Sequence, residues 1–284
     1  MPAKVVAWNH TNGSALTVAP QIKQLSDLAG KTVAVPFWYS IHNVVVQEML
    51  RQAGLQAVTG TPTQNQVKLL VLSPADMVPA LASGQIQGFI VAEPFNALAE
   101  ARNVGHILRF TGDVWQNHAC CVVLMHESDL TQRAAWSQGV VNAIVNAQQW
   151  IRQNRQETAS ILSRSDSHQY TPHDRDVLAQ VLAPTAEKYS LWQADGAMSH
   201  PSWHQQRIDF QPYPYPSYFA TLVEQLKTTV MEGDASFLKN LDPQQASAEL
   251  VDDQFVRHSI AQVGGMAAFG LPENSFTRQE IIAP

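Results

Sequence analysis

Short apolar runs alternate with amphipathic stretches along the first half of the chain. The runs at 31–37, 67–72, 86–92, 106–110 and 119–125 are continuous rather than alternating, which predicts strands buried on both faces of a sheet. Helices are predicted between them, over about 41–53, 74–83 and 94–102. This alternation of strands and helices is typical of an α/β fold with parallel strands.

The second half of the chain is mostly helical in its pattern. Apolar residues at helical spacing predict helices over about 134–153, 156–163, 173–182, 217–231 and 246–262. The stretch 207–217 is different, because its alternating prolines exclude a helix or a central strand. We predict an extended loop there.

Composition excludes several classes of protein. The chain has 284 residues, of which 45% are hydrophobic, so it can bury a core and is not disordered. Its net charge of −6 argues against nucleic acid as a partner. No apolar run is long enough for a membrane helix, so no direct membrane insertion is expected. The first residues show no charged and apolar leader, which indicates a chain that is not exported, or else a mature or truncated form.

The predicted carboxyl ends of the strands carry the candidate binding residues, because ligands bind there in open α/β sheets. Ser40, His42 and Asn43 lie at the start of a predicted helix, where free backbone N–H groups favour an acceptor. Trp38 and Tyr39 offer flat faces beside them. The structural alternatives are a simple helix cap for Ser40, a solvated His42, and burial of the two aromatic rings between lobes.

Glu93 directly follows a predicted apolar strand, so we expect it to be at least half buried. It could face a ligand, or it could interact only with the start of the following helix. Its occurrence together with the polar helix start at 40–43 favours a site.

Metal binding has weak support in the sequence. His118 lies close to Cys120 and Cys121, but neighbouring residues on a regular strand point to opposite faces. We therefore predict no metal site and no cofactor, with at least one cysteine in the core. There is also no nucleophile elbow, phosphate loop or dinucleotide fingerprint.

Several motifs, in order across about residues 25–130, resemble those of one family. They are D-L-A-G-K-T-V-A-V at 27–35, S-I-H-N at 40–43, P-A-D-M at 74–77, I-V-A-E-P-F-N at 90–96 and D-V-W…H at 113–118. Together they resemble the substrate-binding proteins of ABC transporters in the nitrate/sulfonate/taurine and thiamine-pyrimidine (NMT1-like) group. This resemblance implies a two-lobed periplasmic binding protein-like fold of type 2, in the α/β class.

The resemblance also implies a division of the chain. Residues 1–28 would be a first-lobe remnant and hinge, 29–128 the second α/β lobe, and 129–284 a helical return that completes the first lobe and adds a C-terminal extension. Compared with the family pattern the chain begins late, so we expect the first lobe to be incomplete.

The implied function is binding of a small solute between the lobes, without catalysis, as the substrate-binding component of an ABC importer. The partners would be a small-molecule solute and, if the chain is exported, a membrane permease. The location would be periplasmic, or cytoplasmic if the start is genuine. The candidate ligand-binding residues are Trp8, Asn12, Trp38, Tyr39, Ser40, His42, Asn43, Glu93, Asn96, Trp115 and His118.

The motifs hold no Lys or Arg apart from Lys31, so we expect a neutral or nitrogen-bearing solute rather than nitrate. Glu93 would accept a hydrogen bond from it or fix the tautomer of His42. Two alternatives stay open. One is a metal-dependent enzyme resembling pyrimidine-precursor synthases, and the other is a cytoplasmic ligand sensor of the same fold that controls a regulatory partner.

Overall fold

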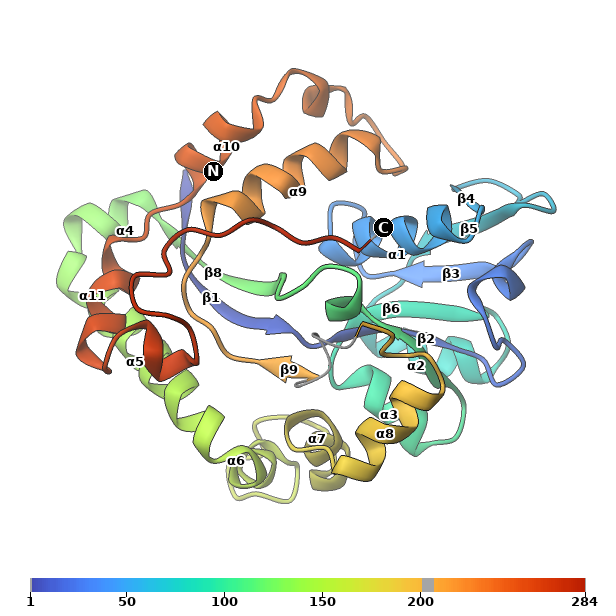
Figure 1. Ribbon diagram of the computed structural model, residues 1–284, viewed down its shortest axis with the longest axis horizontal. Coiled ribbons are helices and arrows are strands. Elements are labelled where there is room, and N and C mark those ends of the chain that lie inside the picture. Colours follow the sequence, from blue (N-terminus) through green and yellow to red (C-terminus); the bar gives the residue numbers. More distant parts are fainter. Residues whose placement is uncertain (1, 201–206, 284) are drawn as a thin grey trace.

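The computed structural model describes residues 2–200 and 207–283 and shows two β-sheets side by side, each covered by helices (Figure 1). The larger sheet has the strand order β4-β5-β3-β6-β2-β7, and the smaller has the order β8-β1-β9. The strands are β1 (Ala3–Asn12), β2 (Ser14–Val18), β3 (Thr32–Val35), β4 (Gln56–Val58), β5 (Gln66–Val71), β6 (Gly88–Ala92), β7 (His106–Phe110), β8 (Ala119–His126) and β9 (Ile208–Asp209).

The α-helices lie mostly after the last strand of the larger sheet. They are α1 (Ile41–Gln52), α2 (Pro74–Ala82), α3 (Phe95–Ala101), α4 (Glu127–Gln132), α5 (Ala134–Gln153), α6 (Arg155–Leu162), α7 (Arg175–Leu182), α8 (Ala186–Ala194), α9 (Pro216–Thr228), α10 (Pro243–Leu250) and α11 (Gln254–Gln262). Short 3-10 turns add η1 (Leu25–Leu28), η2 (Thr111–Asp113), η3 (Ser236–Asn240) and η4 (Met266–Phe269). None of the helices in the described ranges is long and apolar enough to span a membrane.

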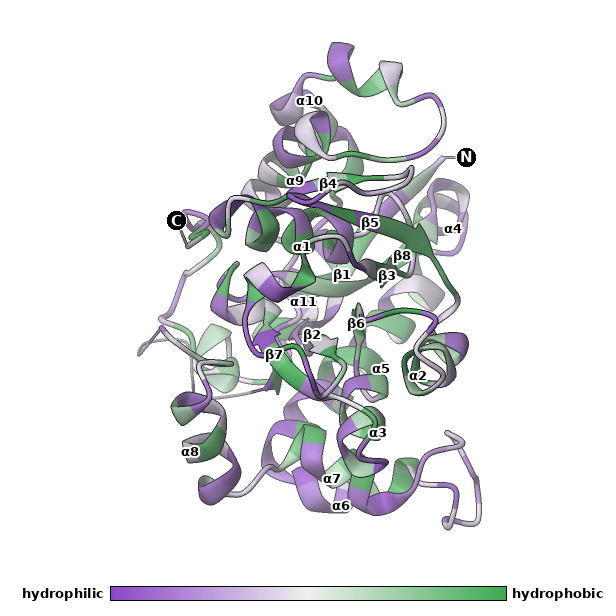
Figure 2. Ribbon diagram, turned by 90° about the vertical axis from the view of Figure 1, so that its right-hand side faces the viewer, coloured by the Kyte–Doolittle hydropathy of each residue, from purple (hydrophilic) through white to green (hydrophobic). Residues whose placement is uncertain are grey.

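The larger sheet is the α/β unit that the hydrophobic pattern predicts. β3 pairs in parallel with β5 and with β6, and α1 and α2 connect these strands. The central strands are hydrophobic, whereas the outer helices α6 and α8 show hydrophilic residues (Figure 2). This is the α/β architecture expected from the sequence.

The chain passes from one sheet to the other at Gly13. β1 ends at Asn12 in the smaller sheet, and β2 begins at Ser14 in the larger one. Gly13 has φ +68°, and a Cβ there would lie 2.9 Å from His10 Nδ1 and from the side chain of Ile208. Only glycine fits this crossing without displacing its neighbours.

The sheets divide the chain at different points from those predicted. β2 already belongs to the larger sheet, although the predicted lobe boundary lies at residue 28. β8 belongs to the smaller sheet, although the predicted second lobe runs to 128. The cause is local, since a single residue, Gly13, separates β1 from β2 and nothing in the neighbouring residues indicates that the two strands enter different sheets.

The proline-containing stretch is extended, as predicted, and is also buried. Residues 207–215 have buried side chains, and β9 within them pairs antiparallel with the end of β1. The predicted helix 246–262 is instead two helices, α10 and α11. They are separated where Val251 forms a bridge to Val5 and the Asp252 N–H donates to the carbonyl oxygen of Val5.

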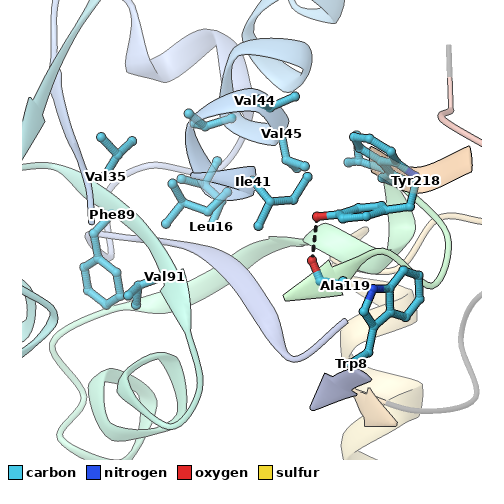
Figure 3. Close-up of a cluster of buried hydrophobic side chains, with 14 of the residues drawn as sticks. Trp8, Leu16, Val35, Ile41, Val44, Val45, Phe89, Val91, Ala119 and Tyr218 are labelled. Carbon is cyan, nitrogen blue, oxygen red and sulfur yellow. Dashed lines mark hydrogen bonds between the residues drawn. The ribbon is translucent and has the colours of Figure 1, made fainter. Parts of the chain in front are cut away.

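One apolar cluster connects both sheets (Figure 3). Trp8 of β1 packs against Tyr218 of α9, with ring centroids 5.2 Å apart, and the Tyr218 hydroxyl donates to the carbonyl oxygen of Ala119 at 2.9 Å. Ile41 and Leu16 of the larger sheet's unit belong to the same cluster. The crossing is therefore held in place by packed side chains.

Candidate functional site

Polar side chains from four segments meet where the chain crosses between the sheets. They are His10 of β1, Ser14 at the start of β2, His42 in the first turn of α1, and Cys120 and Cys121 of β8. Ser14 Oγ lies 2.9 Å from His42 Nε2 and 3.2 Å from Cys120 Sγ. We call these five residues the junction cluster.

The inner part of the junction cluster, formed by Ser14 and His42, is shielded from solvent. Ser14 and His42 are buried, with 1% and 6% of their surface exposed. Burial, followed by the charges of His118 and His10, lowers the pKa of His42 to about 3. His42 is therefore a neutral imidazole at pH 7, able to share one hydrogen bond with Ser14.

The outer part of the junction cluster, which we call the outer junction cluster, contains His10 and the two thiols. Cys120 is partly buried and Cys121 is exposed, and their Sγ atoms lie 3.9 Å apart. The hydrogen bond with Cys120, and then His10, lowers the pKa of Cys121 to about 4, while the contact with Cys121 raises the pKa of Cys120. Cys121 is therefore the more acidic of the two thiols.

The expectation that the cysteines diverge is wrong. In the pairing of β1 with β8, His10 faces Cys121 and Thr11 faces Ala119, so Cys120 is an extra residue without a partner in the register. Such a bulge breaks the alternation of side chains between the two faces of a strand. Both sulfur atoms can then lie close together.

Glu93 lies beside the junction cluster, since its backbone N–H donates to the carbonyl oxygen of Gly13 at 2.8 Å. Its partner is Arg207, whose Nε donates to Glu93 Oε1 at 2.6 Å. The side chains of Arg207 and Glu93 are 0% and 2% exposed, and Arg207 also contacts Glu100 at 3.3 Å. Burial raises the pKa of Glu93, and the charge of Arg207 opposes that rise.

This ion pair corrects the role expected for Glu93. His42 bonds to Ser14, and Glu93 bonds to Arg207 and to the backbone N–H of Ala97. Glu93 therefore does not fix the tautomer of His42 and is not an unpaired charge. The sequence analysis missed Arg207 because it lies 114 residues away, at the start of the proline-containing stretch.

The other polar residues at the start of α1 hold the local fold. Ser40 caps the helix, accepting from the Asn43 N–H and donating to the carbonyl oxygen of Phe37. The Asn43 side chain donates to the carbonyl oxygens of Trp38 and Val230. These contacts match the structural alternative for Ser40 and engage Asn43 within the protein.

Asn96 and Asn12 are also engaged within the protein. Asn96 is fully buried, accepts from Thr17 Oγ1 at 2.8 Å and donates to the carbonyl oxygen of Val91. Asn12 has a left-handed backbone, with φ 57°, and its amide donates to Asn117 Oδ1 at 3.3 Å.

Most of the predicted aromatic and histidine residues lie in the core. Trp8 and Trp115 are 0% and 1% exposed, and the Trp115 indole donates to Glu280. His118 is fully buried between Thr111 Oγ1 and the carbonyl oxygen of Ala119, and burial lowers its pKa to about 4.

Trp38 and Tyr39 lie in the loop before α1. Both are partly buried against the main apolar cluster. The Tyr39 ring contacts the rings of Phe37 and Phe237, at centroid distances of 5.6 and 5.9 Å.

Of the predicted site residues, the structure therefore brings His42 into the junction cluster and places Glu93 beside it. The sequence analysis missed His10 and Ser14, and it gave Cys120 and Cys121 no role. One signal was present, since His10 and Ser14 frame a short polar stretch around Gly13 directly after an apolar strand.

A separate surface hollow of about 410 Å³ lies between α3, α7 and α8. Glu100 and Lys188 are among its lining residues, and none of the predicted site residues is. The hollow is therefore distinct from the junction cluster.

Comparison with curated proteins finds nitrate-import proteins. The chain is 30% identical over 163 residues to the nitrate import ATP-binding protein NrtC of Synechocystis sp., a match that covers 54% of this chain and 24% of that protein. It is 26% identical over 239 residues to the nitrate/nitrite binding protein NrtA of Nostoc sp., covering 77% of this chain and 51% of NrtA. The chain thus matches at most about half the length of these two relatives.

Comparison with solved structures agrees on the fold. The periplasmic nitrate-binding protein NrtA of Synechocystis superposes with a TM-score of 0.76 at 17% identity, covering 98% of this chain and 71% of that one. The fold is that of the type 2 periplasmic binding proteins. The sequence profile of the NMT1-like family matches residues 1–163, which is more than half of the chain. The chain belongs to the NMT1-like family.

Proposed function

We propose that the chain binds a small solute at the crossing between its two sheets, as the substrate-binding component of an ABC importer. The observation that supports this most directly is the junction cluster itself. It lies where the carboxyl ends of β3 and β6 face the smaller sheet, which is where open α/β sheets bind ligands. Three parts of the chain that are remote in sequence contribute to it, at residues 10–14, 42 and 120–121.

The chemistry of the junction cluster favours an uncharged or nitrogen-bearing organic solute. His42 is neutral at pH 7 and Ser14 provides a hydroxyl, so both can donate or accept a hydrogen bond. The opposite charges of the nearby Glu93 and Arg207 neutralise each other within the protein. An anion such as nitrate would need a cation, and no member of the junction cluster is a lysine or an arginine.

The names of the similar proteins suggest the partner and the compartment. A periplasmic binding protein delivers its solute to a membrane permease, and the match to an import ATP-binding protein supports an importer as the assembly. We therefore propose a permease as partner and the periplasm as location.

The proposal is tested by measuring thermal unfolding with a panel of solutes. The panel comprises nitrate, bicarbonate, taurine, an alkanesulfonate, a pyrimidine and a small amide. A ligand present at a hundredfold excess over its Kd stabilises the folded chain by about 2.7 kcal/mol, which is readily measured. We expect stabilisation by the amide or the pyrimidine, and not by nitrate.

Variants then assign the ligand to the junction cluster. His42→Ala should weaken calorimetric binding about tenfold, because it removes a buried hydrogen-bonding group. His258→Ala, which changes an exposed histidine on α11, should bind as the wild type does. Equal affinities of the wild type and His42→Ala for the stabilising solute would rule out this location.

A further inference from the structure

We propose that His10, Cys120 and Cys121 form a binding site for a Zn²⁺ ion. One ligand atom from each of these residues lies within 4.8 Å of the other two. The inference stands on the geometry of the outer junction cluster and does not depend on the solute or on transport.

The donors are of the type that zinc prefers. Two sulfur atoms and one imidazole nitrogen are soft to borderline ligands, which select Zn²⁺ over hard ions such as Mg²⁺ or Ca²⁺. Two cysteines and one histidine with an open fourth position form a known type of zinc coordination. Zn²⁺ bound by two thiolates and one neutral imidazole would form a site without net charge, and any proton still on a thiol would be released to solvent.

The spacing of the donors suits a tetrahedral ion. With Zn–S bonds of about 2.3 Å, tetrahedral geometry places two sulfur ligands roughly 3.8 Å apart. The Cys120 and Cys121 Sγ atoms lie 3.9 Å apart. The thiols therefore need little movement to bind one ion together.

Two local features of the fold produce this arrangement. The bulge at Cys120 turns both sulfur atoms to one side of β8. Gly13 leaves room for the His10 ring, since a Cβ at that position would lie 2.9 Å from His10 Nδ1. His10 Nδ1 is buried and has no hydrogen-bond partner among the described residues. This ring nitrogen of His10 thus has an unused capacity to form a hydrogen bond or to bind a metal ion.

The inner part of the junction cluster lies next to one of the two sulfur donors. His42 Nε2 lies 3.8 Å from Cys120 Sγ, and Ser14 Oγ lies 3.2 Å from the same sulfur. His42 is not part of the group of three residues whose ligand atoms lie within 4.8 Å of one another, so a water molecule would supply the fourth ligand. On the opposite side, Cys121 is exposed, which gives the ion a route of entry.

The experiment uses the full chain, reduced with a phosphine and freed of metal by a chelator. Zn²⁺ is titrated against a chromophoric competitor, and Co²⁺ serves as a spectroscopic probe of thiolate ligation. We expect one Zn²⁺ per chain and a thiolate-to-Co²⁺ charge-transfer band. Loss of both thiols in C120S/C121S should lower the zinc affinity by more than about 100-fold, and H10A should lower it by at least about tenfold.

Control variants separate the site from general effects. H258A, with an exposed histidine removed, should bind Zn²⁺ as the wild type does. C121S changes only an exposed side chain, so it tests ligation even if C120S/C121S fails to fold. No stoichiometric Zn²⁺ binding, or equal affinity of C121S and the wild type, would overturn the proposal.

Discussion

The two sides of the crossing between the sheets both contain polar side chains but use them differently. On the side of the larger sheet, Ser40, Asn43 and Asn96 bond to nearby backbone and side-chain atoms. On the side of the smaller sheet, His10 keeps a ring nitrogen without a partner in the described part of the chain, and Cys121 is exposed. These three polar residues are therefore engaged within the protein, whereas the irregular strand pair leaves donor atoms unengaged.

The physical reason lies in the backbone. The first turn of a helix has free N–H groups, and nearby polar side chains such as Ser40 satisfy them. A strand bulge instead places a side chain outside the regular pattern without requiring it for a backbone hydrogen bond. Cys120 is such a residue.

The largest expected effect comes from breaking the ion pair beside the junction. Arg207→Met would leave the buried Glu93 carboxylate without its main partner, and we expect a loss of about 3–5 kcal/mol in the free energy of unfolding. Urea denaturation measures it. Arg133→Met, at an exposed pair with Asp129, should cost less than about 1 kcal/mol. Similar losses in both variants would show that burial of Arg207 does not matter.

The second expected effect is a loss of stability in acid caused by His42 and His118. Their pKa values in the folded protein are about 3 and about 4, against 6.5 for an ordinary histidine. Above pH 6.5 both states of the chain are deprotonated at these residues and this stability is fully present. As the pH falls below 6.5, only the unfolded chain takes up protons, so the unfolding free energy decreases towards pH 4.

Between pH 7 and pH 5 this amounts to about 2 kcal/mol for each histidine, or about 4 kcal/mol together. Denaturant unfolding at both pH values should show a decrease that is about 2 kcal/mol smaller in His42→Gln than in the wild type. An unchanged pH dependence in this variant would mean that His42 is not buried in its neutral form.

The third expected effect concerns the side of the larger sheet alone. Asn43→Ala removes donors to the carbonyl oxygens of Trp38 and Val230 and should cost about 1–3 kcal/mol of stability. Its zinc affinity should match that of the wild type, because it touches no member of the outer junction cluster. Asn65→Ala, at an exposed position, is the matched control for stability. A large loss of zinc binding in Asn43→Ala would erase the contrast between the two sides.

The smallest expected effect comes from the helix cap. Ser40→Ala removes the acceptor for the Asn43 N–H and should lower the unfolding free energy by about 1 kcal/mol. Ser73→Ala is the comparison, because the Ser73 side chain makes no capping hydrogen bond to α2. Thermal unfolding of the two variants side by side checks whether Ser40 acts as a cap, and equal melting temperatures would speak against it.

The sequence was most informative where the signal was local. The apolar runs and the turn residues around α1 and α2 predicted the core of the larger sheet, since a buried strand or a capped helix is encoded by neighbouring residues. The short strands β2 and β9 were missed because each pairs with distant partners and has little pattern of its own.

The candidate site was predicted only in part for the same reason. His42 could be found because it follows a helix cap at the end of a strand. Arg207 could not, because its partner Glu93 lies 114 residues away and no periodicity connects them. Cys120 and Cys121 were excluded as joint metal ligands because a regular strand would point them to opposite faces. A bulge such as the one at Cys120 is not visible in the sequence.

By itself, the sequence determined the α/β class, the family and the positions of most helices, because burial pattern and capping act over a few residues. Only the tertiary structure decided which polar groups meet. The turn at Gly13 brings β1 and β2 into different sheets, and the bulge at Cys120 turns two sulfur atoms towards His10. Both outcomes depend on the packing of segments that are far apart in the chain, and no local pattern encodes them.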